Sequence, residues 1–236
     1  MGDVSVPDTR LSLDAKLRGP AMFGFVLPAT GVVSTETATA APAARLFPEE
    51  AAHIANAVPK RRAEFSTVRA CADAALRALG ATRPPQVPGK GGMPPWPTGI
   101  VGSMTHCAGR YAAAVARTSS FRGLGIDAEP RVPLPEGILE SISSTEERAS
   151  LQRLWREVPE VNWDTILFSA KESVYKAWYP LARATLDFTD GSIVIGHDGT
   201  FSAQLDVAAP AWLPRSFDGR WAVGEGLIVT AVTVPR

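Results

Sequence analysis

The amino-acid sequence predicts an α+β fold, in which helices pack on small antiparallel sheets. Amphipathic helical segments and segments of alternating or β-branched residues occur in both halves of the 236-residue chain. These segments do not follow a strict order of strand, helix and strand, which argues against a doubly wound parallel sheet. With 45% apolar and 20% charged residues, the chain can bury one large core or two small ones.

The first half begins with a polar, irregular N-terminal arm over residues 1–20. Helices are expected from Phe47 to Ala57 and from Arg61 to Leu79, the second followed by Gly80, a typical residue after a helix end. The expected strands are MFGFVLP, GVVSTETA, IVGSMTH, YAAAVAR and GLGIDAE. The segment RPPQVPGKGGMPPWPTG holds too many Pro and Gly residues for a helix or an inner strand. We expect it to be an exposed loop that is suited to ligand binding.

The second half is expected to contain helices first and strands afterwards. The helices span Glu136–Ser143, Thr145–Glu157 with Ser144 as N-cap, and Trp163–Tyr179 before Pro180. The expected strands are Ser192–Gly196, Phe201–Val207, Arg220–Val223 and Leu227–Val234.

A cut after Gly123 divides the chain into two proposed halves, residues 21–123 and 124–236, with opposite charge. Residues 1–123 carry 14 Lys and Arg against 8 Asp and Glu, whereas residues 124–236 carry 10 against 16. One half therefore suits phosphate groups and the other suits cations. Uneven distribution of solvated surface charge would give the same count, so this observation alone leaves both interpretations open.

The composition also predicts where the protein is located. No apolar run approaches the roughly 18 residues of a membrane span, and the first twenty residues lack a basic stretch followed by an apolar core. We expect a cytoplasmic protein that does not bind membranes. Cys71 and Cys107 have no CxxC spacing, so we expect small buried hydrophobic residues and not a disulfide framework or a zinc site.

Two carboxylates occupy alternate positions in the segment GIDAEP. If this segment is a strand, Asp127 and Glu129 share one face, about 7 Å apart along the backbone. Carboxylates at this spacing are typical ligands of Mg²⁺, which completes its coordination with water and substrate phosphates. An edge strand with its polar face in water is the alternative interpretation.

The segment FSAKESVYKAW is helical by propensity and places Glu172 and Lys176 on one face, at positions i and i+4. Lys171 lies about 100° around the helix from Glu172. A surface ion pair would explain Glu172 and Lys176. It would not explain why Phe168 and Trp178 occupy the same helix, which suggests a mostly covered element whose charges need partners.

Two further segments could contact phosphate. Ser103 and His106 lie in the small-residue segment GSMTH and can donate hydrogen bonds to phosphate oxygens. Arg61 and Arg69 form a basic edge on the predicted long helix, and guanidinium groups match phosphate geometry. A structural histidine and a solvated basic face are the alternatives. The balanced total charge and the absence of a nucleic-acid-binding motif argue against nucleic acid as a partner.

Taken together and in this order, the segments resemble the 4'-phosphopantetheinyl transferase superfamily, of the surfactin and enterobactin synthase type. The resemblance is strongest to the actinobacterial branch that serves polyketide and nonribosomal peptide synthases. It covers about Lys60 to Trp178, through RRAEFSTVR, PPWPTGIVGSMTHCAG, GIDAEP and FSAKESVYKAW. The family often has Trp where Phe168 stands, a departure that concerns packing. The N-terminal arm and the C-terminal strands carry no matching motif.

The resemblance implies a pseudo-dimer of two similar α+β halves with the active site in the cleft between them. It implies that Mg²⁺, with Mn²⁺ as an alternative, is bound by Asp127, Glu129 and Glu172. Glu172 would also act as base, and Lys176 would stabilise charge on the leaving phosphate. The implied coenzyme A contacts are Arg61, Arg69, Lys90, Ser103, His106, Lys171 and Lys176.

The implied reaction transfers the phosphopantetheine arm of coenzyme A to a serine of an acyl or peptidyl carrier protein and releases 3',5'-ADP. A site inside one chain needs no second subunit, so we expect a monomer. Two other functions use the same residues: a metal-dependent phosphohydrolase, and a non-catalytic protein that binds coenzyme A or a nucleotide.

Overall fold

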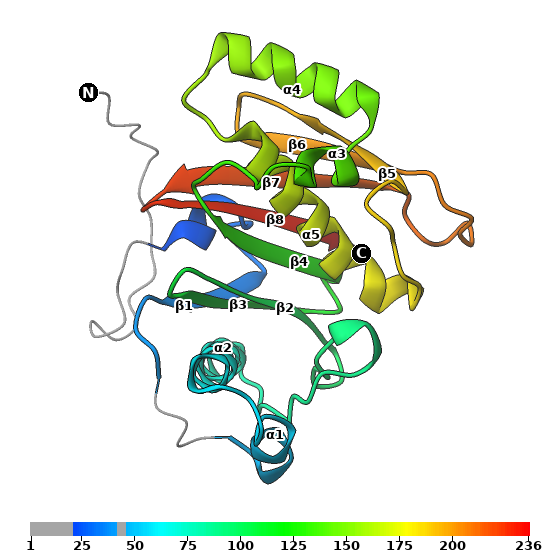
Figure 1. Ribbon diagram of the computed structural model, residues 1–236. Helices are drawn as coiled ribbons and strands as arrows, with labels where there is room; N and C mark the ends of the chain where they lie inside the picture. Colours follow the sequence, from blue (N-terminus) through cyan, green and yellow to red (C-terminus); the bar gives the residue numbers. More distant parts are fainter. Residues whose placement is uncertain (1–20, 42–45) are drawn as a thin grey trace.

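The structure is a computed structural model, and it describes residues 21–41 and 46–236. The N-terminal arm expected over residues 1–20 lies outside the described residues. Two antiparallel sheets form the molecule, and one long helix packs on each (Figure 1). This arrangement confirms the α+β class.

The smaller sheet has three strands in the order β1-β3-β2. These are β1 (Val32–Thr37), β3 (Arg110–Arg117) and β2 (Ile100–Cys107). Helix α2 (Pro59–Ala78) covers this sheet, because its buried Val68, Ala72 and Leu76 repeat with helical spacing. The short helix α1 (Pro48–His53) precedes α2, and the 3₁₀ turn η2 (Lys90–Gly92) lies in the proline-rich loop.

The larger sheet has five strands in the order β4-β8-β7-β6-β5. Helix α5 (Trp163–Ala182) packs on β4 and β8, and α3 (Ile138–Ile142) and α4 (Thr145–Glu157) complete this half. The strands are β4 (Phe121–Pro130), β5 (Gly191–Ile195), β6 (Thr200–Leu205), β7 (Ser216–Gly224) and β8 (Leu227–Pro235). Helices α2 and α5 both have 20 residues, so the halves are similar, but their sheets have three and five strands.

Edge strands β2 and β4 lie side by side and join the halves (Figure 1). The Ser103 hydroxyl accepts a hydrogen bond from the Ile126 amide at 3.1 Å. Gly123, proposed as the boundary between the halves, lies inside β4.

Several sequence predictions were wrong in detail. Helix α1 ends at His53 and not at Ala57, and β7 begins at Ser216 and not at Arg220. The segment MFGFVLP is a 3₁₀ helix, η1 (Met22–Phe25), and not a strand. Its buried residues are Met22, Phe23, Val26 and Leu27, a helical spacing that a short apolar run does not reveal. Helix α5 does not end at Pro180 but continues to Ala182, where Arg183 adopts a left-handed conformation. Within the described residues, no helix is long and apolar enough to cross a membrane.

Candidate active site

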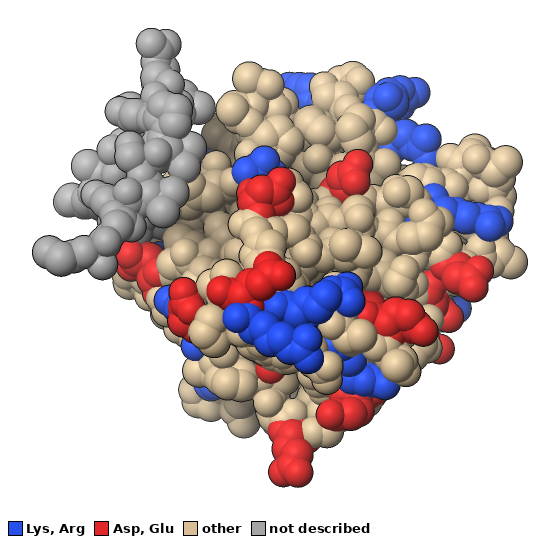
Figure 2. Space-filling model, turned by 90° about the horizontal axis from the view of Figure 1, so that it is seen from above, with Lys and Arg blue, Asp and Glu red and all other residues tan. Residues whose placement is uncertain are grey.

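A cleft of about 330 Å³ lies between the two halves. One wall comes from α2, β2 and the proline-rich loop, and the other comes from α5. Six of the residues that the sequence singled out line it: Arg61, Arg69, Ser103, His106, Glu172 and Lys176. Away from the cleft, the face over α4 carries patches of both charges side by side (Figure 2).

Helix α5 approaches β4 very closely because β4 has glycines on the facing side. A Cβ atom at Gly125 would lie 1.9 Å from the Ser173 carbonyl oxygen. Only glycine allows this approach, which places the polar face of α5 against Asp127. The sequence GLGIDAE thus supplies both the space for the helix and the carboxylate beneath it.

Asp127 is only 3% exposed and is bound by three side chains from two elements, β2 and α5. Its Oδ1 atom accepts hydrogen bonds from Lys176 Nζ at 2.6 Å and from the Thr105 hydroxyl at 3.2 Å. Its Oδ2 atom accepts one from the Ser169 hydroxyl at 2.8 Å. A buried carboxylate with these partners has a fixed orientation.

Two further carboxylates are electrostatically coupled to Asp127. Burial raises the pKa of Glu129 to about 7, and the negative charges of Asp127 and Glu172 add to this rise while Lys176 opposes it. Burial also raises the pKa of Glu172, with Asp127 adding to the effect and Lys176 again opposing it. One ammonium group therefore does not balance the three carboxylates.

Among the described residues, no three His, Cys, Asp or Glu side chains are already arranged as a metal site. The chemistry of the donors nevertheless fits an oxygen-preferring divalent cation, because Asp127, Glu129 and Glu172 offer only carboxylate oxygens. The repulsion among these three carboxylates also favours a cation, because a positive charge between them would reduce the repulsion.

The opposite wall is basic. Arg61 Nη1 lies 2.9 Å from His106 Nε2, and Glu64 Oε2 lies 3.9 Å from Arg61 Nη1 and 4.0 Å from His106 Nδ1. Burial lowers the pKa of His106, so a neutral ring can accept the hydrogen bond from Arg61. Half of the Arg61 side chain is exposed, which leaves the guanidinium accessible from the cleft.

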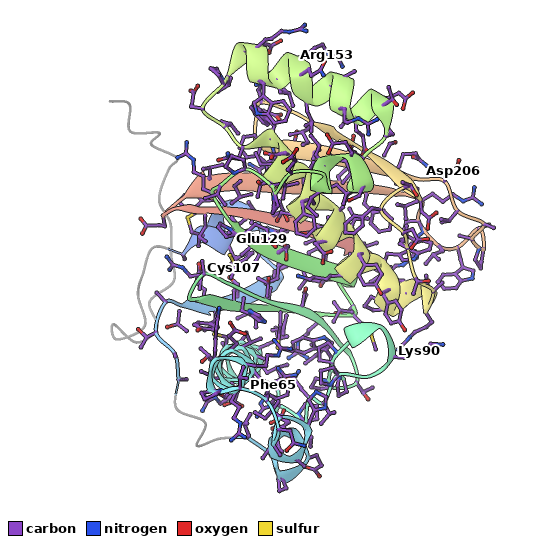
Figure 3. The ribbon with its side chains drawn as sticks, in the orientation of Figure 1. Phe65, Lys90, Cys107, Glu129, Arg153 and Asp206 are labelled. Atoms are coloured by element: carbon purple, nitrogen blue, oxygen red, sulfur yellow. The ribbon has the colours of Figure 1, made fainter. Side chains whose placement is uncertain are left out.

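Arg69 and Ser103 line the cleft but are buried and already hydrogen-bonded. Arg69 is 5% exposed and donates hydrogen bonds to the Gln86 and Phe65 carbonyls. The Ser103 hydroxyl accepts a hydrogen bond from the Ile126 amide of β4. Lys90 is exposed on η2, whose Gly91 and Gly92 line the cleft. Figure 3 shows Lys90 beside the C-terminal end of α5.

Lys171 does not join this cluster, which differs from its expected role as a phosphate contact. It is 7% exposed and donates to Glu147 Oε2 at 3.0 Å and to the carbonyls of Phe188 and Gly191. Its position on α5 turns it away from Asp127 and toward α4 and β5. Lys171 thus ties three elements together inside the C-terminal half.

Several residues that shape the site were not singled out from the sequence. Thr105 and Ser169 bind Asp127, and Ser169 Oγ lies 2.9 Å from Thr230 Oγ1. Glu50, read only as part of a helix start, is fully buried behind the basic wall. A hydroxyl residue directly before His106 was the one available sequence signal, for Thr105.

Both halves of the chain match known protein families. Residues 49–116 match a family model described as the 4'-phosphopantetheinyl transferase N-terminal domain, and residues 123–232 match that of the 4'-phosphopantetheinyl transferase superfamily. The chain is 55% identical over 197 residues to the 4'-phosphopantetheinyl transferase Svp of Streptomyces mobaraensis, covering 82% of this chain and 80% of that protein.

Two further relatives extend the similarity. The chain is 43% identical to the 4'-phosphopantetheinyl transferase PptT of Mycobacterium tuberculosis, over 89% of this chain and 96% of the relative. It is 37% identical to enterobactin synthase component D of Salmonella typhimurium, over 74% of this chain and 72% of that protein.

Proposed function

This chain belongs to the 4'-phosphopantetheinyl transferase family, and we propose that its interdomain cleft transfers the phosphopantetheine arm of coenzyme A to a carrier-protein serine. The observation that carries the proposal is a cleft with basic residues on one side and Glu172 and Lys176 on the other, where Lys176 binds the buried Asp127 and Glu172 and Glu129 are electrostatically coupled to it. Coenzyme A carries phosphates that the basic wall can bind, and the carboxylates can hold a divalent cation beside them.

The basic wall binds and orients coenzyme A in this proposal. Arg61 and His106 provide hydrogen-bond donors at the mouth of the cleft, and Arg69 adds a buried positive charge behind them. Lys90, on the exposed η2 turn, completes the cradle from the loop side.

The chemical step forms a bond between the serine oxygen and the β-phosphorus of coenzyme A. The bond from that phosphorus to the bridging oxygen breaks, and 3',5'-ADP leaves. Glu172, a carboxylate that lines the cleft, takes the serine proton. Lys176 stabilises the negative charge that grows on the leaving phosphate.

A divalent cation held by Asp127, Glu129 and Glu172, Mg²⁺ with Mn²⁺ as the alternative, would supply positive charge to the pyrophosphate. Thr105 and Ser169 keep Asp127 oriented for this purpose. In this proposal the protein is a cytoplasmic monomer, and its substrates are carrier proteins of polyketide or nonribosomal peptide synthases.

Intact-mass measurement of a purified apo carrier domain, incubated with this protein, coenzyme A and Mg²⁺, tests the function directly. We expect a gain of about 340 Da that EDTA abolishes. No gain on several carrier types, together with hydrolysis of coenzyme A, would instead indicate a phosphohydrolase. Binding of coenzyme A without either reaction would indicate a non-catalytic binding protein.

A further inference from the structure

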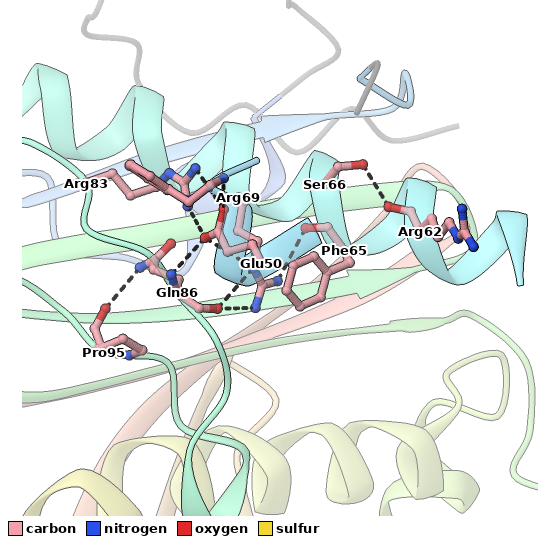
Figure 4. Close-up of polar contacts among 9 residues, drawn as sticks. Glu50, Arg62, Phe65, Ser66, Arg69, Arg83, Gln86 and Pro95 are labelled. Carbon is pink, nitrogen blue, oxygen red and sulfur yellow. Dashed lines mark hydrogen bonds and ion pairs between the residues drawn. The ribbon is translucent and has the colours of Figure 1, made fainter. Parts of the chain in front are cut away.

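A buried ionic cluster of Glu50, Arg69 and Arg83 lies directly behind the basic wall of the cleft (Figure 4). Glu50 is 0% exposed, and each arginine is 5% exposed. An ionised carboxylate without access to water is stable only when hydrogen bonds satisfy its oxygens. The partners of Glu50 therefore show which segments this carboxylate organises.

Glu50 accepts hydrogen bonds from three residues in two segments, the start of its own helix and the loop that follows α2. The Phe47 amide binds Oε2 at 2.9 Å, and the Gln86 amide binds Oε1 at 2.7 Å. Arg83 binds both oxygens through its two terminal nitrogens, in a forked contact. Burial alone would raise the pKa of Glu50, but the bonds from Arg83 and the two amides lower it below the ordinary value. Glu50 is therefore an anion at neutral pH.

The same cluster fixes Arg69. Arg69 donates to the Gln86 carbonyl from Nη2 at 2.7 Å and from Nε at 3.2 Å, while Glu50 Oε1 lies 3.9 Å from Nε. Gln86 is thus held at its amide by Glu50 and presents its carbonyl to Arg69. Glu50 also supplies the negative charge that compensates this buried guanidinium, whose pKa burial lowers to about 9.

The proline-rich loop depends on the same anchor. Pro88 and Gly91, which follow Gln86 closely in the chain, line the cleft. The Gln86 side chain donates to the Pro95 carbonyl at 3.4 Å, so the two ends of the loop are also connected. Because Glu50 fixes the position of Gln86, it also fixes the position of the loop residues that line the cleft.

We propose that Glu50 is a positioning residue for coenzyme A, which holds Arg69 and the base of the proline-rich loop without touching the substrate. The inference rests on the proposed function, because it takes the cleft as the coenzyme A site. It predicts a defect in binding of coenzyme A and not in the chemical step.

Glu50→Gln is the first test, because glutamine keeps the volume but loses the charge and points an NH₂ donor at other donors. We expect the Kd and KM for coenzyme A to rise about tenfold, with kcat within about threefold of wild type. The matched control is Glu36→Gln, which changes a carboxylate in the same half that does not line the cleft. Its KM should equal that of wild type.

A double variant tests whether Glu50 acts through Arg69. In an Arg69→Ala background, adding Glu50→Gln should raise the Kd for coenzyme A by less than about threefold, because only its bond to the Gln86 amide at the base of the loop remains to be lost. A full tenfold effect in that background would overturn the proposal. An unchanged KM in Glu50→Gln would also overturn the proposal. A decrease in kcat alone, in proportion to the decrease in thermal stability, would overturn it as well.

If Glu50→Gln does not fold, Arg83→Lys takes its place, since it keeps the positive charge but loses the forked contact. We expect a rise of about threefold in the Kd, and no rise would contradict the proposal. Coenzyme A binding is measured without a carrier protein, so a wild-type protein that binds but does not transfer would refute the proposed function alone. The Kd comparison would still decide the role of Glu50.

Discussion

The two walls of the cleft have opposite surpluses of buried charge. On the N-terminal wall, two guanidinium groups face one carboxylate, that of Glu50. On the C-terminal side, Glu172 lines the cleft and is coupled to Asp127 and Glu129 on β4, so three carboxylates share one ammonium group, that of Lys176. The same chemical group therefore shifts in opposite directions, because the pKa of Glu50 is lowered whereas that of Glu129 rises to about 7. The ratio of partners, more than burial itself, decides which state a carboxylate adopts.

This difference assigns complementary tasks to the walls. A wall with surplus positive charge is completed by an anion, and a wall with surplus negative charge is completed by a cation. The phosphates of coenzyme A would compensate the positive charge, and a divalent cation would compensate the negative charge. Breaking one wall at a time should therefore produce different defects.

The largest effect is expected from Asp127→Ala on the carboxylate wall. The substitution removes a proposed metal ligand and leaves Lys176 without its 2.6 Å partner, so transfer should fall by on the order of 10²–10³-fold. Carrier mass gain at limiting Mg²⁺ measures this, with Asp127→Asn as a control that keeps the side-chain size. Undiminished turnover in Asp127→Ala would refute the metal assignment.

The residues of this wall differ in how far the sequence predicts them. Asp127 and Glu129 follow from the two-residue period of a strand, and Glu172 and Lys176 from the four-residue spacing of a helix. Lys171 was expected to contact coenzyme A, but it lies about 100° around α5 from Glu172 and contacts α4 and β5, an environment that only packing reveals.

The opposite wall was less predictable. Arg61 and Arg69 share a helix, so their basic edge was visible in the sequence. The role of Glu50 depends on contacts with Arg83 and Gln86, more than 30 residues away, which no local pattern encodes. Strand and helix boundaries were predicted well where alternation or caps were clear, as at Ser144, whose hydroxyl accepts from the Glu147 amide.

Lys171→Met tests whether the carboxylate wall has a single ammonium group. Because the Lys171 and Glu147 side chains are both buried, removing one partner should lower the free energy of unfolding by about 3 kcal/mol. Below the melting temperature, the KM for coenzyme A should stay within about twofold of wild type. Lys176→Met is the matched control and should abolish transfer. A raised KM for coenzyme A in Lys171→Met without a loss of stability would mean that Lys171 contacts coenzyme A. The carboxylates would then not share a single ammonium group.

The smallest effect concerns Glu36, a carboxylate outside both walls that forms no close ion pair with any residue that the structure describes. Burial raises its pKa to about 7, against weaker opposite effects from the Phe23 amide and Arg110. The folded protein thus holds a proton between about pH 4.5 and 7 that the unfolded chain releases, so its stability falls as pH rises through this range. In Glu36→Gln this component is absent, so the unfolding free energy of the variant relative to wild type should rise by up to about 3 kcal/mol across that window. Urea unfolding of both proteins at several pH values measures the difference. A difference independent of pH would mean that Glu36 is ionised in the folded protein, and that a carboxylate without a surplus of cationic partners can retain its charge here.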